Sequence, residues 1–213
     1  MAYFETPDKA MKMKLYFSNP SPYARKARMT IIEKGLNDRV EQVLRNPFDD
    51  PADLRTVNPL GKVPVLILPD GQALYDSAVI CEYLDTLSET PSLMPIDSKT
   101  RWQTLRRSAL TDGILDAAVS LVMERRRPAE ERSEHWRTRW EAAILRSVAV
   151  ANSDIAGFSG GISLDQIGLG AALGYLDLRI ININWRRGNP DLSDWFDQFS
   201  QRPSMQQTMP LSG

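Results

Sequence analysis

The sequence is poor in the two residues that most often build metal and redox sites, because its 213 positions include one cysteine, Cys81, and one histidine, His135. One cysteine excludes an intramolecular disulfide scaffold and a two-cysteine redox motif, and the two residues together exclude a zinc site of the Cys/His type. A Ser-His-Asp hydrolase would have to use His135, which lies in the polar run of residues 130–139, a pattern typical of a solvated helix face. The sequence therefore predicts no metal and gives little support to histidine-dependent catalysis.

A dominant charge is also absent. Lysine and arginine number 26, aspartate and glutamate 27, and the formal net charge is −1. Because no strong positive field would draw the protein onto nucleic acid, we expect no nucleic-acid partner. The longest apolar stretch, residues 164–183, contains Asp165, Asp177 and Arg179, which are costly at the centre of a bilayer. We therefore expect no membrane partner and interpret this stretch as a buried helix.

The first residues lack the continuous apolar segment that a secretory signal requires, since Glu5, Asp8 and Lys9 interrupt them. Residues 1–12 are expected to form a disordered extension. A cytoplasmic, reducing location fits the lone Cys81, whose place in a helical pattern indicates a small core residue rather than a nucleophile.

Short extended and helical patterns alternate in the first half of the chain. Strands are expected at residues 13–17, 39–45 and 63–68 and in a return strand that ends at residue 75, and helices are expected at residues 23–34, 51–57 and around 80–87. The order β-α-β-α-β-β-α predicts a mixed sheet with helices packed on it, because each amphipathic stripe must be covered.

The second half is helical almost throughout, with helices expected at residues 99–127, 129–155, 164–185 and 192–201. Ser163 and Gln166 have the spacing of a capping box at the start of the third helix, and Ile162 and Ile167 occupy the positions of a hydrophobic staple. We predict an α+β protein with two domains, residues 13–89 and an all-α bundle of residues 99–213, joined by a connector of residues 90–98.

Several motifs in the first half suit a peptide-like ligand. Ser21 lies just before the first helix, where free backbone amides and the helix dipole favour an anionic atom. Val63 precedes Pro64 at the mouth of the apolar strand, and a cis bond there would turn the Val63 backbone toward a peptide. Asp76 and Ser77 begin a later helix, whose free amides suit a carboxylate and whose aspartate suits an ammonium group.

Each motif also has a purely structural interpretation. Ser21 would cap the first helix, and Pro64 would mark an edge strand. Asp76 and Ser77 would form a cap and nothing more. Lys62 is the nearest cation for a further carboxylate of a ligand. The functional interpretation requires all of these motifs to converge on one place.

In this order the motifs resemble those of the glutathione transferase family. The resemblance runs from residue 13 to about residue 210 and is carried by Lys14-Leu15-Tyr16-Phe17-Ser18, Ser21-Pro22-Tyr23-Ala24-Arg25, Asn58-Pro59-Leu60-Gly61-Lys62-Val63-Pro64, Leu74-Tyr75-Asp76-Ser77 and Arg202-Pro203-Ser204. It implies a thioredoxin-like N-terminal domain, an all-helical C-terminal domain, a homodimer, and the tripeptide glutathione at the expected peptide site.

The resemblance also implies roles for individual residues. Ser21 occupies the family's catalytic position, with Ser18 as the competing assignment, and a hydroxyl there would hydrogen-bond the sulfur of glutathione and favour its thiolate. Val63 would pair with the cysteinyl backbone, Asp76 and Ser77 would hold the γ-glutamyl group, and Lys62 would reach the glycyl carboxylate. Relatives of the cysteine type carry cysteine at the position of Ser21, so serine argues against thiol-disulfide exchange.

A second substrate is expected between the loop after the first strand and the long helix of residues 99–127. Its candidate lining residues are Tyr23, Leu115, Val119, Val122 and Met123, several of which could instead be core or dimer contacts. The run of residues 125–127, all arginine, would either attract an anionic substrate or complement the C-terminus of the helix.

The sequence thus predicts a glutathione S-transferase of the serine type that joins glutathione to a small hydrophobic electrophile. Two alternatives stay open at this point. The first is another glutathione-dependent activity, namely that of an isomerase, dehalogenase, peroxidase or reductase. The second is a non-catalytic binding module on the same fold, because a fold does not determine a function.

Overall fold

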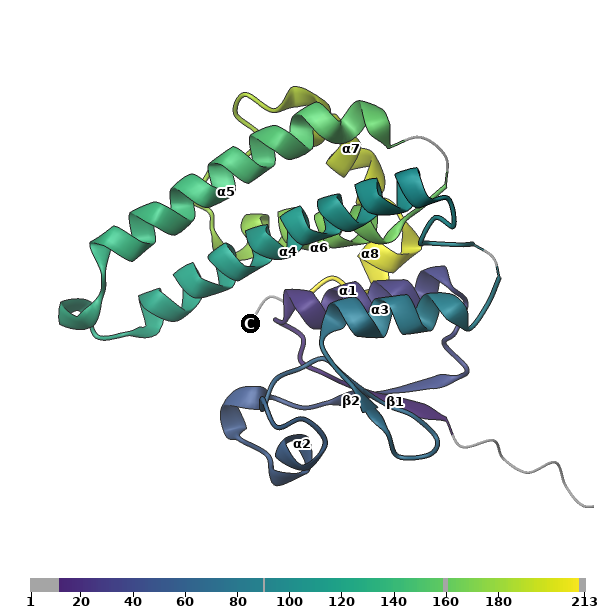
Figure 1. Cartoon of the computed structure of the whole chain (residues 1–213). Coiled ribbons are helices and arrows are strands. Elements are labelled where there is room, and N and C mark those ends of the chain that lie inside the picture. The colour runs from purple at the N-terminus through teal and green to yellow at the C-terminus, as the bar shows by residue number, and fades with distance from the viewer. Residues whose placement is uncertain (1–11, 90, 159–160, 211–213) are drawn as a thin grey trace, which may run out of the picture.

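The computed structural model describes residues 12–89, 91–158 and 161–210. The predicted extension, residues 1–12, therefore lies outside the described residues except for Lys12. Figure 1 shows two layers, a sheet with its helices formed by the first half of the chain and a group of helices formed by the second half. Helices α1 (Pro22–Glu33) and α3 (Ser77–Thr86) of the first layer lie on the side of the sheet that faces the second layer.

The N-terminal region follows the predicted order of elements. It contains β1 (Met13–Phe17), α1 (Pro22–Glu33), β2 (Val40–Leu44), the 3-10 turn η1 (Pro47–Asp49), α2 (Ala52–Val57), β3 (Val65–Ile67), β4 (Ala73–Leu74) and α3 (Ser77–Thr86). The sheet order is β2-β1-β3-β4, in which β1 is parallel to β2 and antiparallel to β3. The predicted mixed sheet is confirmed, and only η1 was not anticipated.

The alternation of side chains in β1 explains how helices cover both faces of this sheet. Met13, Leu15 and Phe17 point into the main core of the protein, which α1 and α3 also line. Tyr16 points to the other face, where it packs against a smaller cluster that includes Leu54 of α2. A strand with both faces covered in this way is held in a single register.

The C-terminal region consists of α4 (Ser98–Arg126), α5 (Glu134–Asp154), α6 (Leu164–Arg179), α7 (Pro190–Phe199) and α8 (Pro203–Gln207), with 3-10 turns at Ala129–Glu131 and Ile155–Gly157. Helix α6 is its centre, because twelve of its sixteen residues are buried and it packs against α4 and α1. Within the described parts of the chain, no helix is both long and apolar enough to cross a bilayer.

Two sequence predictions for α6 are wrong. The helix ends at Arg179 rather than at residue 185, and the following turns are held by the indole of Trp185, which donates to the Asp177 carboxylate at 2.7 Å. The capping box does not form, because the Ser163 hydroxyl hydrogen-bonds the Asp165 carboxylate and makes no cap to the backbone. Asp165 is buried, so its carboxylate competes for the hydroxyl of Ser163.

Helix α1 joins the two regions through buried polar contacts. The Lys26 ammonium lies 2.6 Å from Asp112 of α4, and the Arg25 guanidinium donates to the carbonyl of Met205 in α8 at 3.1 Å. At the end of α1, Glu33 accepts hydrogen bonds from Arg202 and Ser204. These contacts hold the helical region in a defined position above the sheet.

Candidate functional site

A cavity of about 740 Å³ opens where the sheet layer meets the helical layer. It is lined by ten of the residues singled out from the sequence: Ser18, Ser21, Tyr23, Lys62, Val63, Pro64, Asp76, Ser77, Val119 and Met123. Val122, a further candidate on α4, lines it as well, whereas Leu115 does not. The loops and helix starts of the N-terminal region form one wall, which we call the N-terminal wall. Residues of α4 and α6 form the facing helical wall.

Ser21 stands at the N-cap of α1 on the N-terminal wall. Its hydroxyl oxygen accepts a hydrogen bond from the Ala24 amide at 3.2 Å, so its proton is still available for another acceptor. Ser18 also lines the cavity, is buried, and uses its carbonyl to accept the Ser21 amide at 3.1 Å. Capping and donation to a ligand are therefore compatible in Ser21, and both serines stay candidates for the donor.

The peptide bond between Val63 and Pro64 is cis. Among the described residues, no backbone group pairs with the amide or carbonyl of Val63. The loop before it is organised by buried Asn58, whose side-chain amide donates to the Lys62 carbonyl at 2.8 Å and whose side-chain oxygen accepts the Leu60 amide at 3.0 Å. Asn58 lines the cavity and was not identified as a site residue from the sequence, although it begins the motif that carries Lys62, Val63 and Pro64.

The start of α3 forms the next part of the N-terminal wall. The Asp76 carboxylate caps this helix by accepting the Ala78 amide at 3.0 Å, and Ser77 beside it is buried. A capping carboxylate satisfies one of the first amides, and helix geometry leaves others in the first turn without an intrahelical acceptor. This helix start can therefore receive a carboxylate while Asp76 offers a negative charge to an ammonium group.

Tyr23 and Asp116 form a hydrogen-bonded pair at the edge of the cavity. The Tyr23 hydroxyl donates to the carboxylate at 2.5 Å. Burial raises the pKa of Tyr23, and the bond to Asp116 and the negative charge there raise it further, well above its usual range. The Tyr23 hydroxyl thus has no second proton to donate to a ligand. Asp116 was not identified as a site residue from the sequence.

The helical wall is one face of α4. Asp116, Val119, Ser120 and Met123 recur at helical spacing and line the cavity. Leu115 was expected among them, and the structure corrects this, because Leu115 lies on another face of α4 and is fully buried in the core. Arg126, Tyr175 and Arg179 complete this wall, and only the arginine run containing Arg126 had drawn attention in the sequence.

Cys81 lies outside the residues that line the cavity, in α3 and fully buried. Burial raises the pKa of its thiol to about 11, which a nearby lysine and the hydroxyl of Thr30 only partly offset. A thiol of this kind stays protonated and is a poor nucleophile at neutral pH. Its assignment as a small core residue agrees with the structure.

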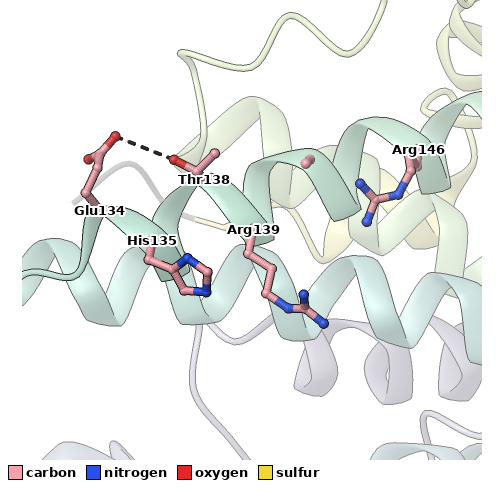
Figure 2. Close-up of a pocket in the computed structure, with 6 residues that line it drawn as sticks. Glu134, His135, Thr138, Arg139 and Arg146 are labelled. Carbon is pink, nitrogen blue, oxygen red and sulfur yellow. Dashed lines mark hydrogen bonds between the residues drawn. The ribbon is translucent and has the colours of Figure 1, made fainter.

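His135 lies on α5, away from the residues that line the cavity. Figure 2 shows it on the surface of that helix beside Arg139, with Glu134 and Thr138 one turn apart. The hollow beside these residues is lined by α5 alone, so no second element supplies a catalytic partner there. In the described residues, no three histidine, cysteine or acidic side chains are grouped closely enough to hold a metal ion.

Comparison with known proteins gives matches along the chain. The family described as "Glutathione S-transferase, N-terminal domain" matches residues 20–87. The uncharacterized GST-like protein YibF of Escherichia coli K12 is 32% identical over 201 residues, which is 93% of this chain and 98% of YibF.

Solved structures agree with these matches. A glutathione transferase family member from Pseudomonas fluorescens Pf-5 with bound glutathione is 38% identical, with a TM-score of 0.91 over 94% of this chain and 100% of that one. A structure from the same organism with bound S-(propanoic acid)-glutathione is 36% identical, with a TM-score of 0.86 over 95% of this chain and 99% of that one. Similarity of this extent shows that the protein belongs to the glutathione S-transferase family.

Proposed function

We propose that the protein is an active glutathione transferase, which binds glutathione along the N-terminal wall as a thiolate and joins its sulfur to a carbon of a small electrophile with a hydrophobic body. The observation that carries the proposal is the convergence on one cavity of three features: the Ser21 hydroxyl, the Val63 backbone, with which no described backbone group pairs, and the start of α3 at Asp76.

The N-terminal wall matches glutathione group by group. The free amide and carbonyl of Val63 suit the backbone of the cysteinyl residue. The first amides of α3, with Ser77, suit the α-carboxylate of the γ-glutamyl residue, and Asp76 suits its ammonium group. Lys62 lines the same wall and suits the glycyl carboxylate. Glutathione so placed would bring its sulfur to the start of α1.

The chemical task at that point is to lower the pKa of a thiol. A free thiol has a pKa of about 8.5, so only a few per cent is thiolate at neutral pH. A hydrogen bond from Ser21 and the N-terminal dipole of α1 both favour the anion, and each unit of pKa corresponds to about 1.4 kcal/mol. The proton leaves to solvent. The sulfur lone pair then forms a bond to the electrophilic carbon. In a substitution a leaving group departs with the bonding electrons, and in an addition to an activated alkene the π electrons move to the activating group and a proton from water completes the product.

Other side chains in the region are less suited to activate the sulfur. The Tyr23 hydroxyl already donates its one hydrogen bond to Asp116. The single cysteine is buried elsewhere, so the chain offers no thiol for a mixed disulfide in the cavity, which disfavours the reductase alternative. The isomerase, dehalogenase and peroxidase alternatives use the same thiolate and differ only in the second substrate.

Conjugation is the form of this chemistry that we favour. Val119, Val122 and Met123 offer an apolar surface on the helical wall, opposite the expected position of the sulfur. The Pseudomonas fluorescens relative is described with S-(propanoic acid)-glutathione, a glutathione that carries an alkyl group on sulfur. A binding module without catalysis would have no need of a free hydroxyl beside such a surface.

The predicted division into residues 13–89, 90–98 and 99–213, the homodimer and the cytoplasmic location are part of the same proposal. Each follows from the family resemblance and the composition of the chain. Gel filtration with light scattering checks the dimer, and limited proteolysis checks the connector between the two domains.

The test of the function combines calorimetry of glutathione binding with ultraviolet difference absorbance of the bound thiolate. We expect the wild type to bind thiolate at neutral pH. We expect Ser21→Ala to keep most of the affinity and to raise the bound thiol's pKa by about one unit or more. Ser18→Ala is the matched control, and a raised pKa in that variant alone would move the donor role to Ser18.

Turnover then separates the alternatives. Wild type should accelerate the reaction of glutathione with an aryl halide or an activated alkene, and Ser21→Ala should lose most of that acceleration. Binding of glutathione without turnover of any electrophile, peroxide or isomerisable substrate would favour the interaction module. No binding of glutathione by the wild type would overturn the catalytic proposal.

A further inference from the structure

The helical wall carries two arginines that make no ion pair with any other described residue. Arg126 ends α4, Arg179 ends α6, and both line the cavity. Their neighbours differ: Arg125 donates to the carbonyl of Arg179 at 2.9 Å and to Asn182, and Arg127 lies 3.1 Å from the carboxylate of Glu131. Of these four arginines, the two whose guanidinium groups bond to no other described residue are the two that line the cavity.

Arg126 contacts an aromatic ring and no described carboxylate. Its guanidinium carbon lies 4.7 Å from the centroid of the Phe48 ring, which also lines the cavity from the facing turn Pro47–Asp49. A guanidinium that stacks through its face keeps its N–H groups at the edge for a planar bidentate acceptor. The stacked ring therefore positions Arg126 without neutralising it.

Tyr175 supplies a third donor beside the two arginines. It lines the cavity, is only 6% exposed, and its hydroxyl makes no hydrogen bond to any other described residue. Burial raises the pKa of Tyr175, and the positive charges of Arg179 and Arg126 only partly offset this effect. Tyr175 is therefore a neutral hydroxyl at physiological pH, next to two cations and without an acceptor.

The carboxylates of the cavity do not balance this positive charge. Asp116 is occupied by the hydroxyl of Tyr23, and Asp76 caps α3 on the opposite wall. Neither aspartate forms an ion pair with Arg126 or Arg179. Arg126 is exposed and Arg179 is partly buried, so water can solvate both, but the buried Tyr175 hydroxyl has no acceptor among the described residues. One anionic acceptor from outside the chain would satisfy this hydroxyl and pair with both cations.

We propose that the second substrate carries a carboxylate, which Arg126, Arg179 and the Tyr175 hydroxyl bind while its apolar body lies against Val119 and Met123. This inference rests on the proposed function, because it concerns the partner of the glutathione sulfur. The carboxylates of glutathione itself are assigned to Lys62 and the start of α3 on the N-terminal wall, which leaves the helical wall for the electrophile.

The test compares two pairs of S-substituted glutathiones by calorimetry. In each pair the members differ only in a carboxylate against its uncharged amide: S-(4-carboxybenzyl) with S-(4-carbamoylbenzyl)glutathione, and S-(2-carboxyethyl) with S-(2-carbamoylethyl)glutathione. We expect the wild type to prefer the carboxylate by about tenfold in at least one pair, the size of one charge-assisted hydrogen bond. Arg126→Gln and Arg179→Gln should each reduce this preference and leave the affinity for unsubstituted glutathione unchanged.

Arg127→Gln is the matched control, because it removes the same charge from the same end of α4 at a residue that is ion-paired and does not line the cavity. It should keep the preference, and Tyr175→Phe should weaken it. Equal affinity for carboxylate and amide in both pairs would overturn the anionic subsite while leaving the transferase proposal intact. Loss of unsubstituted glutathione binding in Arg126→Gln or Arg179→Gln would also overturn it, by assigning these arginines to glutathione. Failure of the wild type to bind any glutathione would instead overturn the proposed function.

Discussion

The two walls of the cavity offer different kinds of chemistry. The N-terminal wall presents backbone groups and short side chains, such as the Val63 amide, the Ser21 hydroxyl and the Asp76 carboxylate, each beside a helix start or a tight loop. The helical wall presents long side chains, such as those of Met123 and Arg126, from the faces of extended helices. A backbone site is suited to one fixed ligand, whereas helix faces can change their side chains and keep the fold.

This difference suggests a division of labour. The N-terminal wall would bind glutathione, and the helical wall would determine which electrophile is accepted. Changes to one wall should then affect one substrate and spare the other. The changes below concern the N-terminal wall, the packing that supports the helical wall, and the junction between the two regions.

The largest effect is expected from Asp76→Ala. The change removes both the cap of α3 and the negative charge assigned to the ammonium group of glutathione. We expect glutathione affinity to fall by about 100-fold, from the loss of a charge-assisted interaction and a helix cap together. Calorimetry measures the affinity. Asp70→Ala, in an exposed turn, is the control, and an unchanged affinity in Asp76→Ala would contradict the role of this wall.

The packing of α6, which supports the helical wall, can be disturbed by a substitution at a residue that does not line the cavity. A β-carbon added at Gly170 in α6 would lie 2.4 Å from a ring carbon of Phe199, which is stacked on Trp195 in the core. We expect Gly170→Ala to lower the free energy of unfolding by about 2 kcal/mol, as overpacking does. Urea unfolding measures it.

Gly113→Ala in α4 is the matched control, because a β-carbon there meets no atom within 4 Å. The same substitution should stabilise the protein by about 0.5–1 kcal/mol through helix propensity. Equal effects of the two variants would show that close packing of α6 is not what supports this wall.

The contact between Glu33 of α1 and the start of α8 should make the free energy of unfolding depend on pH. Burial raises the pKa of Glu33, but the hydrogen bonds from Arg202 and Ser204 outweigh it, so the pKa lies below its usual range. A carboxyl with a lowered pKa stabilises the fold above its unfolded pKa, and this stability is lost as the pH falls through the folded value.

Glu33→Gln should therefore cost about 1 kcal/mol of unfolding free energy at pH 7 and less at pH 3.5. Urea titrations of both proteins at the two pH values measure the difference. A cost that is the same at both values would mean that the charge of Glu33 contributes nothing to the junction.

The smallest effect is expected from Tyr23→Phe. Because the Tyr23 hydroxyl donates its hydrogen bond to Asp116, removing it should leave the pKa of the bound glutathione thiol unchanged. Turnover should change by about threefold or less. Thiolate absorbance against pH measures this. A rise of one unit in that pKa would instead identify Tyr23 as the donor to sulfur.

The sequence predicted the N-terminal wall well because its features are local. A cap such as Ser21 or Asp76 is defined by the few residues that follow it, and the position of Pro64 marks the end of a loop. The order of strands and helices was also readable, since each has its own hydrophobic period. The capping box at Ser163 failed for the opposite reason, because a buried carboxylate nearby competes for the hydroxyl.

The helical wall depends on tertiary structure. Leu115 and Asp116 are neighbours in the chain, yet one is in the core and the other lines the cavity, because the rotation of α4 is decided by its packing against α5 and α6. The same packing brings Arg126 and Arg179 together from residues far apart in sequence. Local sequence was sufficient for the family, for most of the elements and for the residues that form the N-terminal wall, since these follow from backbone chemistry within a few residues. Which side chains of α4 and α6 line the opposite wall of the cavity was decided only when the helices packed.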